Sequence, residues 1–176
     1  MFETKNLIIR PSEWGDLNDF FVWEQMPEVT EVLSIRDGQT TEDVVRKYVS
    51  DDNEPSARQF TILLKGEDEP KKIGRIVLGD IEEGWKAEIW RIYIADTALR
   101  GKGYGKEAME AIMSYCFDEL KLERLYLDHY TGNPASYLYL SLGFKYEGVL
   151  RKNCRKNGIL YDVHLMSMLK DEYYNR

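Results

Sequence analysis

The sequence predicts a mixed α/β fold, in which helices flank a sheet that is mostly antiparallel but contains one central pair of parallel strands. Three observations indicate this fold. Apolar runs of strand length recur from residue 60 onward, an apolar stripe with helical spacing covers residues 108–120 between two of them, and Asn157-Gly158 separates the last two runs. A strand–helix–strand order requires a right-handed parallel crossover, whereas short loops join antiparallel neighbours.

The N-terminal part is expected to contain one short strand and two helices. Residues 6–10 form an apolar strand that Pro11 ends. One helix is expected to begin near residues 14–16, and another after a capping Thr40 or Thr41. The apolar faces of these helices consist of Leu17, Phe20, Phe21 and Trp23 in the first and of Val44, Val45 and Tyr48 in the second.

The middle of the chain is rich in strands. Residues 60–64, 72–78 and 87–95 each form an apolar run with β-branched and aromatic residues. In the last of these runs, four side chains stand two positions apart, and a regular strand places them on one face. These four residues are Glu88, Trp90, Ile92 and Ile94.

The last part of the chain predicts a helix, a strand, a short helix and a hairpin. The helix that carries the apolar stripe at residues 108–120 is followed by a buried strand at 124–128. The short helix begins at Asn133-Pro134 and ends at Gly143, since Asn is a preferred N-cap, Pro suits the first turn and Gly suits the exit. Asn157-Gly158 then predicts a hairpin turn of type I′.

Length and charge limit the classes of protein. The 176 residues are expected to fold as a single domain, 1–176. The net charge of −7 argues against a nucleic-acid partner and is compatible with a cationic substrate, although solubility alone accounts for it. No apolar run approaches about 18 residues, and residues 1–5 lack the pattern of a secretion signal. We therefore expect a cytoplasmic protein with no membrane partner.

Cysteine and histidine are scarce. Cys116 lies on the apolar stripe and is expected in the core, while Cys154 stands close to the end of the hairpin. His129 and His164 are expected to be packed strand residues. None of the four has the spacing of a metal ligand pair, so no metal is expected.

A glycine-rich loop, Arg100-Gly101-Lys102-Gly103-Tyr104-Gly105-Lys106, lies between the strand at 87–95 and the helix that follows. Such a loop suits a phosphate group, because glycines allow close approach of the backbone and the start of a helix attracts an anion. The spacing matches neither the dinucleotide-binding fingerprint nor the Walker P-loop. The alternative is a helix-entry turn that binds no ligand.

These residues resemble the GNAT superfamily of N-acetyltransferases. Arg100, Gly103 and Gly105 match the loop motif of that family, and Asn133 precedes Leu138-Tyr139 and Leu142-Gly143-Phe144 as in its members. The closing residues 144–151 resemble the branch that contains ribosomal-protein N-terminal and spermidine acetyltransferases. The resemblance implies a GNAT-like mixed sheet and acetyl-CoA as cosubstrate. It also implies a set of cosubstrate-binding residues: Ile92, Tyr93, Ile94, Arg100, Gly101, Lys102, Gly103, Tyr104, Gly105, Lys106 and Asn133.

The chemistry of amine acetylation requires an acid, a base and a group that stabilises the oxyanion. Tyr139 matches the family position of the acid, and a phenol is protonated at neutral pH. Tyr137 lies about 200° away around the same helix, so the two cannot both face the thioester sulfur. Tyr139 could instead be a core residue whose hydroxyl is bonded to the backbone. The resemblance further implies that backbone N–H groups of Ile92 to Ile94 receive the oxyanion.

Glu88 is the candidate base, because Ala87-Glu88-Ile89 resembles a GNAT strand that carries a basic glutamate. An exposed charge at the strand edge is an equal alternative, and the less favoured substitutes are Glu82, Glu83 and Asp128. A covalent acyl intermediate on Cys154 is a further alternative.

The predicted function is direct transfer of an acetyl group from acetyl-CoA to a primary amine in a ternary complex. The acceptor is a protein N-terminus, a polyamine or another small amine. A non-catalytic acyl-CoA-binding module is the alternative, since it would need the glycine loop but neither Tyr139 nor Glu88. A homodimer through the C-terminal strands is also expected.

Overall fold

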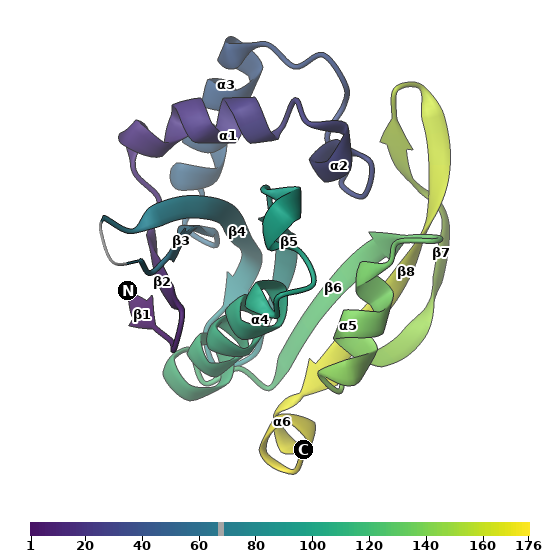
Figure 1. Ribbon diagram of the computed structural model, residues 1–176. Helices are drawn as coiled ribbons and strands as arrows, with labels where there is room; N and C mark the ends of the chain where they lie inside the picture. Colours follow the sequence, from purple (N-terminus) through teal and green to yellow (C-terminus); the bar gives the residue numbers. More distant parts are fainter. Residues whose placement is uncertain (67–68) are drawn as a thin grey trace.

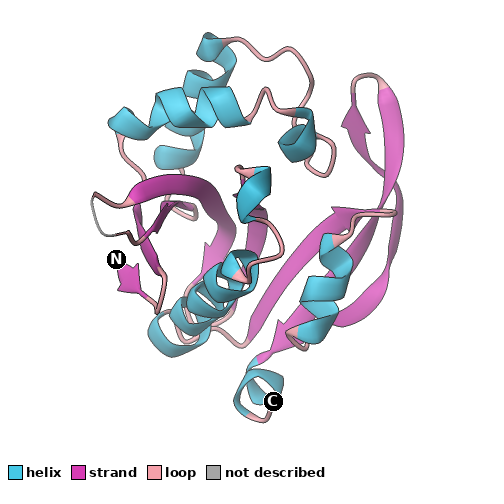
Figure 2. Cartoon of the chain, viewed as in Figure 1, coloured by secondary structure: helices cyan, strands magenta, loops and turns pink. Residues whose placement is uncertain are grey.

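The computed structural model describes residues 1–66 and 69–176 (Figures 1 and 2). The strands are β1 (Phe2–Glu3), β2 (Leu7–Pro11), β3 (Arg58–Leu64), β4 (Lys71–Glu82), β5 (Lys86–Ile94), β6 (Arg124–Tyr130), β7 (Lys145–Lys156) and β8 (Ile159–Leu169). The helices are α1 (Leu17–Trp23), α2 (Pro27–Thr30), α3 (Thr41–Asp52), α4 (Tyr104–Ser114), α5 (Ala135–Ser141) and α6 (Lys170–Tyr174). Short 3-10 turns precede α1 and α4, and a π-helical stretch, Tyr115–Glu119, continues α4.

One sheet contains all of these strands, in the order β1-β2-β3-β4-β5-β6-β8-β7. Every neighbouring pair is antiparallel except β5 and β6, which are joined through α4. The mixed sheet with one central parallel pair is therefore confirmed. Within residues 1–66 and 69–176, no helix is long and apolar enough to cross a membrane.

The two faces of the sheet are covered by different helices. On one face, Met109 and Ile112 of α4 and Cys116 of the π-helical stretch pack against strand residues such as Ile76. They form the main core, which confirms that Cys116 is a core residue. On the other face, α1 and α3 form a smaller cluster around Phe20. Figure 1 shows these layers, with α4 and α5 in front of the central strands and α1 and α3 above them.

A β-bulge interrupts β5 and corrects the prediction for this strand. Val77 of β4 pairs with Arg91 and the next residue, Leu78, pairs with Ile89, so Trp90 is an extra residue. An extra residue shifts the alternation of side chains by one position. The expected common face of Glu88, Trp90, Ile92 and Ile94 is therefore wrong. Glu88 and Trp90 lie on the face of α1 and α3, whereas Ile92 and Ile94 pack against the main core under α4.

The parallel strands β5 and β6 stay paired over only part of their length. Lys86–Ile89 pairs with Arg124–Leu127, and the two strands then continue to Ile94 and Tyr130 without pairing to each other. Figure 1 shows β5 and β6 separating beyond their paired ends. This divergence leaves the inner edge of β5 without a strand partner and opens the centre of the sheet.

Two turns in the C-terminal part have the predicted conformations. Asn157 and Gly158 have φ angles of 50° and 80°, which confirms a hairpin turn that needs positive φ at both positions. Asn133 accepts a hydrogen bond from the backbone N–H of Ala135 (2.9 Å), but the N-cap of α5 is Pro134, one residue later than predicted. Gly143, with φ of 95°, ends this segment as expected.

Candidate active site

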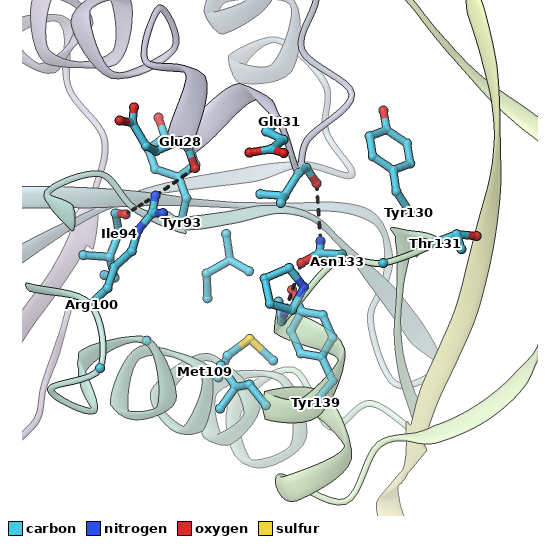
Figure 3. Close-up of a pocket in the computed structure, with 18 of the residues that line it drawn as sticks. Glu28, Glu31, Tyr93, Ile94, Arg100, Met109, Tyr130, Thr131, Asn133 and Tyr139 are labelled. Atoms are coloured by element: carbon cyan, nitrogen blue, oxygen red, sulfur yellow. Dashed lines mark hydrogen bonds between the residues drawn. The ribbon is translucent and has the colours of Figure 1, made fainter.

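A cleft of about 860 Å³ lies where β5 and β6 separate. Its walls come from β5, the loop before α4, the end of β6, the start of α5 and the segment around α2 (Figure 3). The lining includes many of the residues that the sequence indicated: Ile92, Tyr93, Ile94, Arg100, Gly101, Gly105, Asn133 and Tyr139. The fold thus gathers residues from distant parts of the sequence around one opening.

The glycine loop presents unsatisfied backbone N–H groups at the start of α4. Gly101 and Gly103 have φ angles of 74° and 90°, which side-chain-bearing residues rarely adopt. Within the described chain, no hydrogen bond engages the backbone N–H groups of residues 101–106. A helix N-terminus with free N–H groups and glycines at positive φ is an arrangement that binds phosphate.

Several predicted loop residues do not line the cleft. Lys102, Gly103, Tyr104 and Lys106 are absent from its walls, and both lysines are exposed. Only alternate parts of a tight turn face inward, so Gly101 and Gly105 line the cleft while the lysines extend into solvent. The loop thus contributes Gly101 and Gly105 to the cleft, while its two lysines place their charges on the surrounding surface.

Arg100 lines the cleft and also joins two of its walls. Its Nη2 atom donates a hydrogen bond to the backbone oxygen of Glu28 (2.8 Å), at α2 (Figure 3). Asn133, which is 9% exposed, donates from Nδ2 to the backbone oxygen of Val32 (3.4 Å). Arg100 and Asn133 therefore contact the segment around α2 from two other walls of the cleft.

Tyr139 faces the cleft from α5 and is 7% exposed, whereas Tyr137 is 78% exposed. This difference confirms that only one of the two tyrosines points inward. Burial, followed by the charge of Asp128, raises the pKa of Tyr139 to about 12. Tyr139 is packed in the main hydrophobic core, and no hydrogen bond to its hydroxyl is found among the described residues. A phenol with a pKa in this range stays protonated at neutral pH, and Tyr139 lines the cleft.

Glu88 lies outside the lining of the cleft, on β5 beside Tyr126 of β6. Burial, followed by the charges of Asp128 and Asp80, raises the pKa of Glu88 to about 7. A carboxylate with this pKa can take and release a proton near neutral pH. Its place on the opposite face of β5 from Ile92 means that a proton would reach it through water.

Cys154 and the two histidines do not line the cleft. Cys154 is partly buried, and its Sγ lies 3.1 Å from the hydroxyl of Tyr130. His129 and His164 stack on each other with ring centroids 5.2 Å apart, as expected for packed strand residues. In the described part of the chain, no group of three or more His, Cys, Asp and Glu residues could hold a metal ion.

The sequence did not indicate the wall of the cleft that the α2 segment forms. Glu28, Glu31 and Val32 line the cleft from the α2 segment, and Tyr161 lines it from the C-terminal hairpin. In the sequence, Glu28 and Glu31 cannot be distinguished from the many other glutamates expected on the surface. Only the tertiary approach of α2 and the hairpin places them at the cleft, so no local pattern could have identified them.

The sequence is similar to those of known N-acetyltransferases. Residues 6–145 match the family described as acetyltransferase (GNAT) domain. The uncharacterized N-acetyltransferase p20 of Bacillus licheniformis is 32% identical over 174 residues, covering 97% of this chain and 96% of that protein. The spermidine N(1)-acetyltransferase of Vibrio cholerae is 32% identical over 137 residues, covering 77% and 75%.

Solved structures show the same similarity. The crystal structure of spermidine N-acetyltransferase from Vibrio cholerae in complex with CoA and spermine superposes with a TM-score of 0.83, at 25% identity over 98% of this chain and 100% of that chain. A putative acetyltransferase from T. thermophilus superposes with a TM-score of 0.81, at 27% identity over 99% and 91% of the two chains.

Proposed function

Because the chain belongs to the GNAT acetyltransferase family and transfers an acetyl group from acetyl-CoA to an amine, we propose that its acceptor is a small polyamine. The observation that carries this proposal is the cleft between β5 and β6, which has free backbone N–H groups at one wall and carboxylates at the other. The alternative of a non-catalytic acyl-CoA-binding module is not favoured by this family membership.

Acetyl-CoA would lie with its pyrophosphate on the glycine loop and its pantetheine arm along the unpaired edge of β5. The free N–H groups of residues 101–106 support the first contact, and the early end of the β5–β6 ladder supports the second. Asn133 would contact the pantetheine arm from the start of α5. This orientation directs the thioester toward Tyr139, which faces the same cleft.

The reaction then needs two proton transfers. The ammonium of the acceptor loses a proton through water to Glu88, whose raised pKa suits a base near neutral pH. The free amine attacks the thioester carbon, and backbone N–H groups of residues 92–94 stabilise the oxyanion. The C–S bond breaks, and the thiolate of CoA takes the proton of the Tyr139 hydroxyl. Tyr139 regains a proton from solvent, and the products are the acetylated amine and CoA.

The acceptor proposal rests on charge and on relatives. Glu28 and Glu31 bring carboxylates to the wall of the cleft that the α2 segment forms, and the net charge of the chain is −7. Carboxylates in a cleft attract cationic ligands and raise their local concentration. The curated relative and the solved structure named above are both spermidine acetyltransferases.

A thiol-release assay tests the proposal. Purified protein with acetyl-CoA is given spermidine, spermine, butylamine or short peptides with a free N-terminus, and the release of CoA thiol is followed. We expect the highest kcat/KM with the polyamines. Preference for peptides would replace the polyamine by a protein N-terminus as acceptor. Binding of CoA without turnover on any amine would instead revive the non-catalytic alternative.

Cytoplasmic residence and a homodimer stay predictions. The dimer is proposed to form through β7, the edge strand of the sheet, which carries exposed Tyr146, Val149 and Leu150. Exposed apolar side chains on an unpaired edge strand favour association with another strand. Analytical ultracentrifugation of the protein and of a Val149→Lys variant tests this: the variant is expected to be monomeric.

A further inference from the structure

The segment around α2 forms the acceptor wall of the cleft, yet it has little support of its own. α2 is a single turn, Pro27–Thr30, and the loop after it continues to the start of α3. A helix this short is not stable by itself, and its last backbone carbonyls lack partners within the helix. Contacts from elsewhere in the fold must therefore hold Glu31 and its neighbours in position.

Part of this support is hydrophobic, because Val29 of α2 is buried against Tyr93 and Ala95. Three side chains from three other elements add hydrogen bonds to the backbone carbonyls of the segment. Arg100 from the glycine loop donates to the carbonyl of Glu28, and Asn133 from the start of α5 donates to that of Val32. Between these two, the ammonium of Lys156, at the end of β7, donates to the carbonyl of Thr30. The carbonyls of Glu28, Thr30 and Val32 are thus each bound by a side chain from a different element of the fold. Positive charge beside helix C-terminal carbonyls is favourable.

Lys156 differs from the other two because it has no place in the binding of acetyl-CoA. It does not line the cleft or contact the glycine loop. The residue is 8% exposed, and among the described residues it takes part in no salt bridge. Burial of an ammonium without a carboxylate is costly, so its hydrogen bond to Thr30 carries unusual weight.

The tip of the hairpin is fixed to the same segment by a second pair of contacts. Asn157 accepts a hydrogen bond from the backbone N–H of Asp37 (3.0 Å) and donates from Nδ2 to the carboxylate of Asp37 (2.9 Å). Figure 1 shows the tip of the β7–β8 hairpin extending up beside α2. The hairpin tip therefore holds both ends of the segment from Thr30 to Asp37.

A second cavity of about 440 Å³ lies between the hairpin tip and α2. Lys156, Asn157 and Asp37 line it, and it shares Glu31 and Tyr161 with the main cleft. The two cavities therefore adjoin at Glu31 and Tyr161, beside the contact between the hairpin and α2. Any movement of that contact would move the wall that an acceptor touches.

We propose that Lys156 is a positioning residue for the acceptor amine: by binding the Thr30 carbonyl it holds the α2 segment so that Glu31 faces the junction of the two cavities. This inference rests on the proposed function, and it assigns the hairpin tip to acceptor binding alone. Lys156 itself contacts neither the glycine loop nor the edge of β5, so its loss is expected to affect binding of the amine more than binding of acetyl-CoA.

The test compares Lys156→Met, which removes the donor but keeps much of the apolar stem, with Lys156→Arg, which restores a donor. For Lys156→Met we expect the KM for the amine to rise about tenfold, as loss of a charge-assisted hydrogen bond implies, while the KM for acetyl-CoA changes less than about twofold. Lys156→Arg should recover most of the amine affinity. Lys152→Met, an exposed lysine of the same strand, is the matched control and should leave both constants unchanged.

Hydrogen exchange of the protein without substrates provides a readout that does not need turnover. Amides of residues 28–37 should exchange faster in Lys156→Met than in the wild type or in Lys152→Met. Equal changes in both KM values, or no faster exchange in residues 28–37, would overturn the proposal. If the wild type acetylates no amine, the proposed function fails and hydrogen exchange alone decides whether Lys156 holds α2.

A second variant covers the case in which Lys156→Met does not fold. Asn157→Gly removes both contacts with Asp37, while glycine keeps the positive φ that the turn needs. It should raise the amine KM and the exchange of residues 28–37 in the same direction, with the acetyl-CoA KM unchanged. A folded Asn157→Gly protein that matches the wild type in all three measurements would contradict the proposal.

Discussion

Gly79 of β4 lies directly against the indole ring of Trp90 of β5, so closely that a Cβ atom on Gly79 would fall 1.9 Å from Trp90 Cε2. Trp90 is the extra residue of the bulge in β5. The missing side chain on β4 thus provides the space into which the bulged residue turns. This contact sits between Glu88 and the strand end that lines the cleft.

Gly79→Ala should therefore destabilise the protein by about 1–3 kcal/mol, because the added methyl group overlaps the indole ring of Trp90, which must shift to accommodate it. Urea denaturation measures this change. Gly15→Ala is the matched control, since no atom lies within 4 Å of its added Cβ, and it should change stability by less than about 0.5 kcal/mol. Equal stability of the two variants would show that Trp90 can leave its place without cost.

The local turns could be predicted from sequence because each depends on the backbone preference of one or two residues. Gly101, Gly103 and Asn157-Gly158 take the positive φ angles that their residue types favour. Tyr139 could be separated from Tyr137 because helix geometry alone sets their directions. Such features are fixed within a few residues of the chain.

The bulge and the acceptor wall could not be predicted in the same way. The bulge at Trp90 depends on Gly79, which lies on another strand, so the alternation in β5 looked regular. The position of Glu31 depends on the hairpin tip near Lys156, more than a hundred residues later in the chain. Contacts between distant segments determine both the bulge and the position of Glu31, and local sequence patterns carry no information about such contacts.

Tyr139→Phe should lower kcat by about 100-fold or more while leaving the affinity for CoA nearly unchanged, because only the proton donor is removed. Steady-state kinetics and calorimetric titration with CoA measure the two effects. Tyr137→Phe, a change to an exposed hydroxyl on the same helix, should behave as the wild type. A Tyr139→Phe enzyme with normal kcat would remove this tyrosine from the mechanism.

The raised pKa of Glu88 predicts an acidic limb in the pH–rate profile. A base must be ionised to accept a proton, so activity should fall as the pH drops below about 7 and Glu88 becomes protonated. Glu88→Gln should be slower and should lose this limb. If the limb persists in the variant with the same midpoint, another group is responsible for it.

The same pKa shift has a consequence for stability. A carboxyl group whose pKa rises on folding favours the folded state when it is protonated, so this contribution is lost as the pH rises from about 4.5 through about 7. Glu88→Gln should consequently be more stable than the wild type at pH 8, by on the order of 1–3 kcal/mol, with most of the difference gone at pH 5. Urea denaturation at the two pH values tests this, with Glu42→Gln as an exposed control that should show no such dependence.

Gly103→Ala should weaken acetyl-CoA binding without affecting the amine. Gly103 has a φ of 90° at the N-cap of α4, and an alanine there is strained enough to turn the N–H groups of the loop away from a bound pyrophosphate. We expect the KM for acetyl-CoA to rise about tenfold, equivalent to about 1.4 kcal/mol, and the KM for the amine to stay unchanged. Gly84→Ala places the same strain at a φ of 74° in the turn between β4 and β5, away from the loop, and serves as the control. A similar rise in the acetyl-CoA KM for both variants would mean that general destabilisation, rather than the shape of the loop, governs the binding of the cosubstrate.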